Sequence, residues 1–582
     1  MSCDHSFLKY CLVNAKGPTI QKLAFAAKRT YNDSLAHDVN LLASFGSYGQ
    51  EPQNITPVLM DMFCKKSSSM LPEPCPVQLP VLVKSMETFS YQVEMKEFWM
   101  FLPHDWLCSM PVDVLAKLWG LDQVDEFWSK HDISNDPSCR KISDVLSSKK
   151  LVPLLLHGDG GQFQREGSLM VISMRSLVTS SPVAHSQMLL IAMPKICVNK
   201  SSDDSLDTMK SVWRILAWSF NALQEGKHPK HNYDGTQFDK SDWRHAVKGT
   251  PLLDNHGATL FVISGDLEYY QNELKLPGHS SNQCCKDCAA NKSDVPHNDY
   301  RATAKWRATV KTPAENEAHP PSSHILLRIA GVTAEMIQYD TLHIIEEGCS
   351  SHAIANSIFD FVILGSKSFV GTQEKKLARL NEKMMRLQLD LDISADRRAR
   401  PLTFTNFCTP SGKHTHFPEL SGMKARHIRY LVPVIAQICR EEHEASKPYT
   451  YHRMKMMEHL DTLCKTIDEA NFHHFSNTES NCFTSAVQSF LAHYTMCSKL
   501  MYKDGARYRF NTVHKFHYLA HMPEKAQYLN PRCCSTYTGE TMVGFIATLA
   551  HSCLNGTPAH QISHKLCWRW RLALDLRVNS HD

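Results

Sequence analysis

Two aspartates in the sequence follow apolar runs of the kind that form buried strands. Asp159 lies in Gly158-Asp159-Gly160-Gly161, directly after the run Leu151–His157, and Asp266 follows the run Ala258–Ser264. Enzymes that cut phosphodiesters often use two divalent cations, and these hard cations need carboxylate oxygens that converge from rigid elements. Two strand-end aspartates and one helical glutamate would meet that need. The alternative for each aspartate alone is a structural role in a glycine-rich turn.

A second set of residues has the spacing of zinc ligands. Cys285-Lys286-Asp287-Cys288 supplies two thiols from one turn, and His517 and His521 would share one face of a helix. Zinc prefers four such ligands in a tetrahedron. The alternative is chance spacing of cysteines together with packing or surface histidines. If the histidines point away, the next ligands to test are Cys284, His279 and His297.

A third pair combines an acid with an imidazole. Asp340 and His343 are three residues apart, so at the start of a helix they could face one site. The alternative for Asp340 is a helix cap.

Composition restricts the classes of protein that this chain can be. With 63 Lys plus Arg against 59 Asp plus Glu over 582 residues, it is neither an acidic solvating protein nor a histone-like one, and nucleic-acid binding would need local patches. The apolar runs are too short to span a bilayer, and the first residues do not form a signal peptide. We therefore expect reduced cysteines and no membrane association.

The apolar patterns predict the elements that must position these residues. Strands are expected at Leu151–His157, Ser168–Met174, Gln187–Met193 and Ala258–Ser264, with a helix at Asp204–Leu223 before the last strand. Helices follow at Gln373–Leu391, Met423–Glu442, Ser485–Leu500 and Gly539–Leu554, the last with Thr538 as a possible cap and Asn555-Gly556 as its stop. A helix is also expected at Val112–Trp119, and a linker at Ser67–Pro80.

Taken together, the motifs resemble the DDE transposases of the cut-and-paste type, most closely the CACTA-like and KDZ (Plavaka-like) groups. The resemblance covers about residues 150–555. Its motifs are Gly158-Asp159-Gly160, Gly265-Asp266, Leu276–Ser280 before Cys285-x-x-Cys288, Tyr339-Asp340-x-x-His343, Leu420–His427, and Lys515–Pro523 before Glu540.

The resemblance implies an α/β fold of the ribonuclease-H-like type: a mixed five-stranded sheet with a large, mostly α-helical insertion before the last catalytic helix. The family's triad carries over as Asp159, Asp266 and Glu540, which would bind Mg²⁺ or Mn²⁺, with Glu524 as a competing last acid. Zinc carries over to Cys285, Cys288, His517 and His521. Asp340 and His343 would lie near the active site or a flipped base.

The implied organisation has four parts: an N-terminal, mostly helical region at 1–150, the first part of the core with the Cys-x-x-Cys turn at 151–300, the helical insertion at 301–530, and the last catalytic helix with the C-terminal segment at 531–582. The segment Lys565–Arg571 alternates Arg and Trp, so it would either line a DNA path or place tryptophans in the core.

The implied function is a DDE-type DNA strand transferase or endonuclease in the nucleus, acting on double-stranded DNA at transposon ends and targets, and a homo-oligomer when active. One alternative is a transposase-derived protein that binds DNA or assembles without catalysis. The other is a ribonuclease-H-like nuclease acting on RNA–DNA hybrids, against which the large helical insertion argues.

Overall fold

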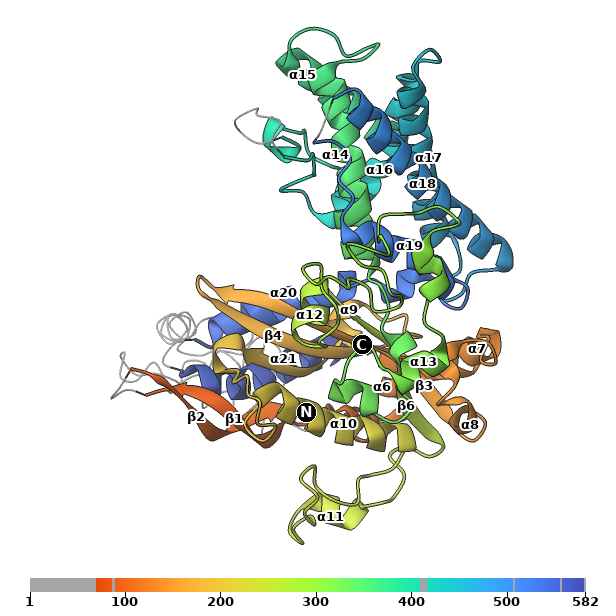
Figure 1. Cartoon of the computed structure of the whole chain (residues 1–582). Coiled ribbons are helices and arrows are strands. Elements are labelled where there is room, and N and C mark those ends of the chain that lie inside the picture. The colour runs from red at the N-terminus through yellow and green to blue at the C-terminus, as the bar shows by residue number, and fades with distance from the viewer. Residues whose placement is uncertain (1–69, 86–88, 409–415, 506–507, 555–556, 580–582) are drawn as a thin grey trace, which may run out of the picture.

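The computed structural model describes residues 70–85, 89–408, 416–505, 508–554 and 557–579 (Figure 1). The fold is mixed α/β. A lobe that contains the central sheet lies below a lobe made almost entirely of helices.

The central sheet has four strands among the described residues, in the order β5-β4-β3-β6. Their bounds are β3 Lys150–Gln164, β4 Gly167–Ser176, β5 Met188–Pro194 and β6 His256–Gly265. The β3–β4 and β4–β5 pairs are antiparallel, whereas β3 and β6 are parallel. All four strands predicted from the apolar runs are confirmed.

The expected fifth strand is not formed as an element in the described part of the chain. On the free side of β6, Ile337 makes a single parallel bridge to Ile263, and the Gln338 amide donates to the Ile263 carbonyl at 3.0 Å. The chain then enters a helix, so the ladder stops after this bridge.

Strand β3 continues beyond the glycine-rich segment that was expected to end it. Asp159 pairs with Val171 of β4, and the pairing extends to Gln164. The expectation that Asp159 stands just past a strand end is therefore wrong. The glycines do not form a turn, because each has a partner across the β3–β4 ladder.

Helices flank the sheet. The predicted helix before β6 is confirmed as α10 (Thr208–Glu225), whose first turn is capped by Asp207 accepting from the Lys210 amide at 2.8 Å. Helix α10 packs on β6, α20 (Tyr537–Ser552) packs on β3 and β4, and α21 (Ile562–Asn579) packs on β5 (Figure 1). Short helices in this lobe are α9 (Val183–Ser186), α11 (Trp243–Val247) and α12 (Leu267–Asn272).

Helix α20 confirms the predicted last helix but begins earlier. Its N-cap is Thr536, which makes no side-chain capping bond, so the expected cap Thr538 lies inside the helix. The expected stop at 555–556 lies outside the described residues.

The N-terminal region contains more than helices. An antiparallel pair is formed by β1 (Cys75–Lys84) and β2 (Tyr91–Met100), so the segment expected to be a linker is a strand from residue 75 to 80. This part is ordered because Val77 and Leu79 of β1 are buried in the core. The helices are α5 (Pro103–Ser109), α6 (Val112–Trp119, as predicted), α7 (Val124–Lys130) and α8 (Ser143–Leu146). The start of the expected linker, 67–69, lies outside the described residues.

The upper lobe has its own buried core. Its helices are α13 (Pro313–Ala318), the continuous helix formed by η8 (Leu342–Ser350), α14 (Ser351–Phe359) and η9 (Asp360–Leu364), and then α15 (Gln373–Asp390), α16 (Ala425–Glu441), α17 (Pro448–Glu469), α18 (Asn477–Lys503) and α19 (His514–Ala526). The core of this lobe includes Cys285 and Cys288, whereas the other core joins the sheet to α20 and α21. The Cys-x-x-Cys turn therefore packs with the helical lobe.

The Arg- and Trp-rich C-terminal segment lies within α21 and is buried. Trp568, Arg569, Trp570 and Arg571 are each 5% exposed or less. Of the two expectations for this segment, the structure supports the core role. None of the described helices is long and apolar enough to cross a membrane.

Candidate functional site

Asp159 and Asp266 lie next to each other on neighbouring strands. Gly158 of β3 is the register partner of Gly265 of β6, and each aspartate is the following residue. Parallel neighbours lie about 4.8 Å apart. The β3–β6 pairing therefore brings the two carboxylates to the same place, even though β3 itself continues further.

The glycine before each aspartate makes room for one tyrosine. A Cβ atom on Gly158 would lie 2.1 Å from the Tyr269 ring, and one on Gly265 would lie 2.5 Å from the same ring. Tyr269 is in the first turn of α12, where its amide donates to Asp266 at 2.5 Å. The repeated Gly-Asp pair thus seats α12 against the strand ends, and Asp266 also serves as its helix cap.

Glu540 joins the aspartates from the first turn of α20. Oxygens of Asp159 and Glu540 and a nitrogen of His157 all lie within 4.8 Å of one another. Gly539 permits this approach, since a Cβ there would lie 2.3 Å from the His157 ring. Asp266 is not in this close group, but it neighbours Asp159 in the β3–β6 ladder and its charge acts on both Asp159 and Glu540.

The site concentrates negative charge in partly buried surroundings. Burial, followed by the neighbouring charges of Glu540 and Asp266, holds the pKa of Asp159 well above its usual value. Burial also raises the pKa values of Asp266 and Glu540. Such acids favour a bound cation, because its charge would offset both burial and mutual repulsion.

Asp340 and His343 adjoin this acid cluster. Asp340 accepts from the amides of His343 (2.9 Å) and Thr536 (2.8 Å) and binds His343 Nδ1 at 2.5 Å. The other ring nitrogen of His343 lies 4.0 Å from a Glu540 oxygen. Burial opposes a charge on His343, but Asp340 outweighs it and raises the pKa of His343 to about 9.

Two residues at this site were not foreseen. His157 is fully buried on the same side of β3 as Asp159, and burial lowers its pKa to about 4. Lys195, from the turn η4 (Lys195–Cys197), reaches the strand, since a Cβ on Gly160 would lie 2.7 Å from its Nζ. His157 could have been found by its two-residue spacing from Asp159; nothing in the sequence points to Lys195.

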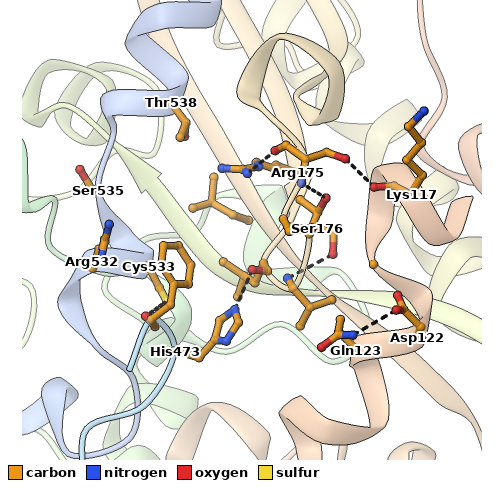
Figure 2. A pocket seen from close by; sticks show the side chains of 18 of the residues that line it. Lys117, Asp122, Gln123, Arg175, Ser176, His473, Arg532, Cys533, Ser535 and Thr538 are labelled. Atoms are coloured by element: carbon orange, nitrogen blue, oxygen red, sulfur yellow. Dashed lines mark hydrogen bonds between the residues drawn. The ribbon is translucent and has the colours of Figure 1, made fainter. Parts of the chain in front are cut away.

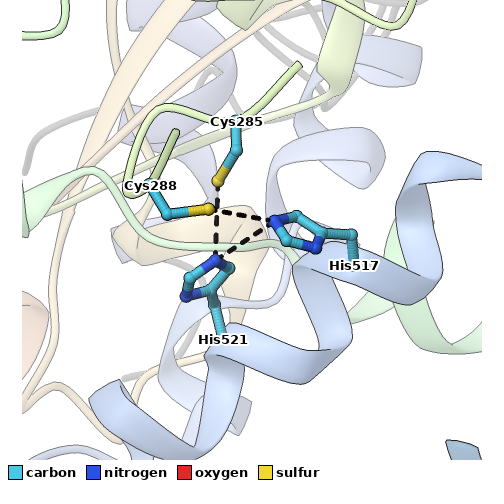
Figure 3. Close-up of side chains that lie close together, drawn as sticks. All are labelled: Cys285, Cys288, His517 and His521. Carbon is cyan, nitrogen blue, oxygen red and sulfur yellow. Dashed lines mark hydrogen bonds between the residues drawn. The ribbon is translucent and has the colours of Figure 1, made fainter. Parts of the chain in front are cut away.

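The four expected zinc ligands form one buried cluster (Figure 3). Cys285 Sγ lies 3.6 Å from His521 Nε2, Cys288 Sγ lies 3.3 Å from His517 Nε2, and the two Nε2 atoms are 3.2 Å apart. A zinc tetrahedron with Zn–S of about 2.3 Å and Zn–N of about 2.0–2.1 Å has edges of about 3.3–3.8 Å. The cluster could therefore hold a metal such as zinc.

The remaining nitrogens of both imidazoles are held by neighbours. His517 Nδ1 donates to the His297 carbonyl at 2.9 Å, and His521 Nδ1 lies 3.1 Å from a Glu524 oxygen. Such contacts leave each Nε2 free to bind a metal. Glu524 is thus at this cluster and not with the aspartates. Its helix α19 continues through Pro523 to Ala526.

A large cavity lies beside the start of α20. It has a volume of about 1140 Å³ and is lined by residues from five parts of the chain, including Lys117, Arg175, Phe472, Arg532 and Thr538 (Figure 2). None of its three cations pairs with an acidic side chain within the described ranges. Arg532 lies over the half-exposed ring of Phe472 at 5.2 Å.

No family model matches the sequence, and no curated protein matches it.

Proposed function

We propose that this chain is a transposase-derived DDE-type DNA strand transferase with a ribonuclease-H-like core. One observation carries the proposal: Glu540, from a distant helix, lies close to Asp159, whose neighbour on the paired strand is Asp266 and whose charge is affected by both. The resemblance of the motif order to CACTA-like and KDZ transposases supports the same interpretation.

In this proposal the three carboxylates hold two Mg²⁺ or Mn²⁺ ions, which would activate the attacking oxygen and stabilise the leaving one. The protein's own groups set the geometry. Asp340 fixes the His343 ring beside Glu540, so a positive charge orients that carboxylate. Tyr269 and the two Gly-Asp pairs hold the aspartates side by side. Lys195 adds a second cation at the edge of the site.

The cavity beside α20 supports DNA as the partner. Two of its residues, Tyr537 and Thr538, belong to the first turn of α20, which also carries Glu540. Lys117 and Arg532 have no acidic partner among the described residues and are suited to phosphates, and Phe472 is suited to base stacking. Double-stranded DNA as substrate also implies work in the nucleus and, by the resemblance, as a homo-oligomer.

The test is metal-dependent cleavage of supercoiled DNA by the purified chain. We expect nicking with Mg²⁺ or Mn²⁺, none with EDTA, and none with Asp159→Asn, Asp266→Asn or Glu540→Gln. Glu382→Gln, an exposed change on α15 and away from both clusters, is the matched control and should keep activity. Bound DNA without any nicking would favour the non-catalytic alternative, and cleavage of RNA–DNA hybrids alone would favour the nuclease.

A further inference from the structure

A second group of metal-binding side chains lies beside the first zinc cluster. Cys284 Sγ and one ring nitrogen each of His297 and His514 lie within 4.8 Å of one another. We propose that Cys284, His297 and His514 bind a second metal ion with zinc-like preferences.

The same two segments of the chain build both groups. Cys284 is adjacent to Cys285, and His514 is one helical turn before His517 on α19. His514, His517 and His521 therefore share one face of that helix. The His297 carbonyl accepts from His517 Nδ1 at 2.9 Å, so the backbone that positions the first group also positions the His297 ring. Binding at one site would pre-order the other.

Two buried ring nitrogens without a hydrogen-bond partner among the described residues support the proposed metal site. His297 Nδ1 and His514 Nε2 are inaccessible to solvent and have no hydrogen-bond partner among the described residues. A buried polar atom without a partner costs free energy, so such atoms are uncommon unless they have a role. Among the described residues, the Cys284 thiol donates to the Ala290 carbonyl at 3.6 Å, a weak hydrogen bond that a metal-bound thiolate would give up. A metal ion would satisfy all three groups at once.

The rings must turn slightly to bind one ion. They stack with centroids 4.4 Å apart and an angle of 7° between their planes, so their nitrogen lone pairs lie in two nearly parallel planes and do not meet at one point. Rotation about χ2 of a histidine is soft, and both side chains are half-buried rather than locked in the core. A turn of one ring would converge the nitrogens towards the Cys284 sulfur.

The donor set determines the kind of metal. One thiolate and two imidazoles select zinc or a similar borderline ion over Mg²⁺ or Ca²⁺, which prefer oxygen. Three protein ligands leave the fourth tetrahedral position for water, in contrast to the four-ligand first cluster. The second ion would therefore exchange faster than the first.

Zinc content of the intact, purified chain tests the proposal directly. After gel filtration in buffer with micromolar zinc, we expect two zinc ions per chain by elemental analysis. Cys284→Ser and His514→Asn should each reduce this to one. Cys482→Ser, which changes an exposed cysteine, should keep two.

Cobalt substitution gives a second readout that does not depend on stoichiometry alone. With three thiolates bound to cobalt, Cys284→Ser should lose about one third of the thiolate-to-cobalt absorption. Cys285→Ser should lose about two thirds, because removing the first ion releases both of its thiolates. One zinc ion per wild-type chain with an occupied first cluster would overturn the proposal, as would two ions retained in both Cys284→Ser and His514→Asn. The outcome is independent of DNA cleavage.

Discussion

At the scale of single residues, repulsion and burial of the carboxylates in the acid cluster should lower the stability of the fold when no cation is bound. Asp159 is 6% exposed, and its carboxylate faces Glu540 and Asp266. A carboxyl whose pKa is raised in the folded state stabilises the fold only at low pH. That contribution is lost as pH rises from the unfolded pKa of about 4 through the raised value.

Asp159→Asn should therefore stabilise the metal-free protein at pH 7.5 while abolishing cleavage. We expect a rise in melting temperature of about 1 °C for each kcal/mol of relieved repulsion, because the unfolding entropy of a chain of 582 residues is large. Added Mg²⁺ should raise the melting temperature of the wild type but not of the variant. Asp122→Asn, an exposed change, should follow the wild type. A large fall in melting temperature for Asp159→Asn would assign this residue a structural role.

Stability should also depend on pH through His343, here because a neighbouring acid favours its charged form. Its pKa is raised to about 9 in the folded protein, against about 6.5 in an unfolded chain, so its stabilising contribution is complete below pH 6.5 and disappears as pH rises through 9. That contribution is at most roughly 3 kcal/mol. His343→Gln should lower the melting temperature more at pH 6 than at pH 9.5. In an Asp340→Asn background this difference should vanish, and a difference that persists there would mean that Asp340 is not its cause.

These residues also show how far the sequence predicts the site. Asp159 and Asp266 could be found because the same Gly-Asp pair follows two apolar runs, and the structure explains the pair by the approach of Tyr269. Lys195 could not be found, because it reaches the site from a short turn after β5 and depends on how that turn packs.

At the scale of elements, the path of β3 and the start of α20 determine the site. Apolar runs predicted the core of each strand, but the ladder past Gly158 depends on its partner β4, which a local pattern does not reveal. The start of α20 differed from the expected cap for a related reason: Thr536 contributes its amide and hydroxyl to Asp340 rather than to a helix cap. Long-range contacts outweighed local signals in both places.

Helix α20 contains a pair of glycines that tests this packing. A Cβ on Gly539 would lie 2.3 Å from the buried His157 ring, whereas Gly544 is exposed with nothing within 4 Å. Gly539→Ala should lower the melting temperature and reduce cleavage, because α20 must move away from β3. Gly544→Ala should stabilise by up to about 1 kcal/mol through helix propensity alone. Equal effects of the two substitutions on melting temperature would contradict a close α20–β3 contact.

At the scale of the whole molecule, the first metal cluster joins the two ends of a long excursion. Cys285 and Cys288 lie near its beginning, His517 and His521 near its end, and all four are buried. An ion at this point would close a loop of more than 200 residues, whose closure is entropically costly. The resemblance implied the four ligands, but only the fold shows them at tetrahedral distances.

His517→Ala and Cys285→Ser should therefore remove the first ion to the same extent. Amide hydrogen exchange should rise in α19 and in the segment around 284–297, while Mg²⁺ still stabilises the acid cluster. His319→Ala, an exposed histidine, should change neither. Loss of metal from one variant but not from the other would show that the four residues do not act as one site.

The cavity beside α20 exists only in the assembled fold, because its cations come from α6, from the end of β4 and from the turn before α20. Arg532 is exposed and stacks on Phe472, so it can be changed without disturbing the core.

If DNA phosphates bind here, Arg532→Gln should weaken duplex binding and reduce the slope of log K against log salt by about 0.9 for each phosphate that the variant no longer neutralises. Arg301→Gln, which removes an exposed guanidinium already paired with Asp299 at 2.7 Å, should leave the slope unchanged. The measurement needs no divalent metal, so it separates DNA binding from cleavage. An unchanged affinity and slope in Arg532→Gln would place the DNA path elsewhere on the molecule.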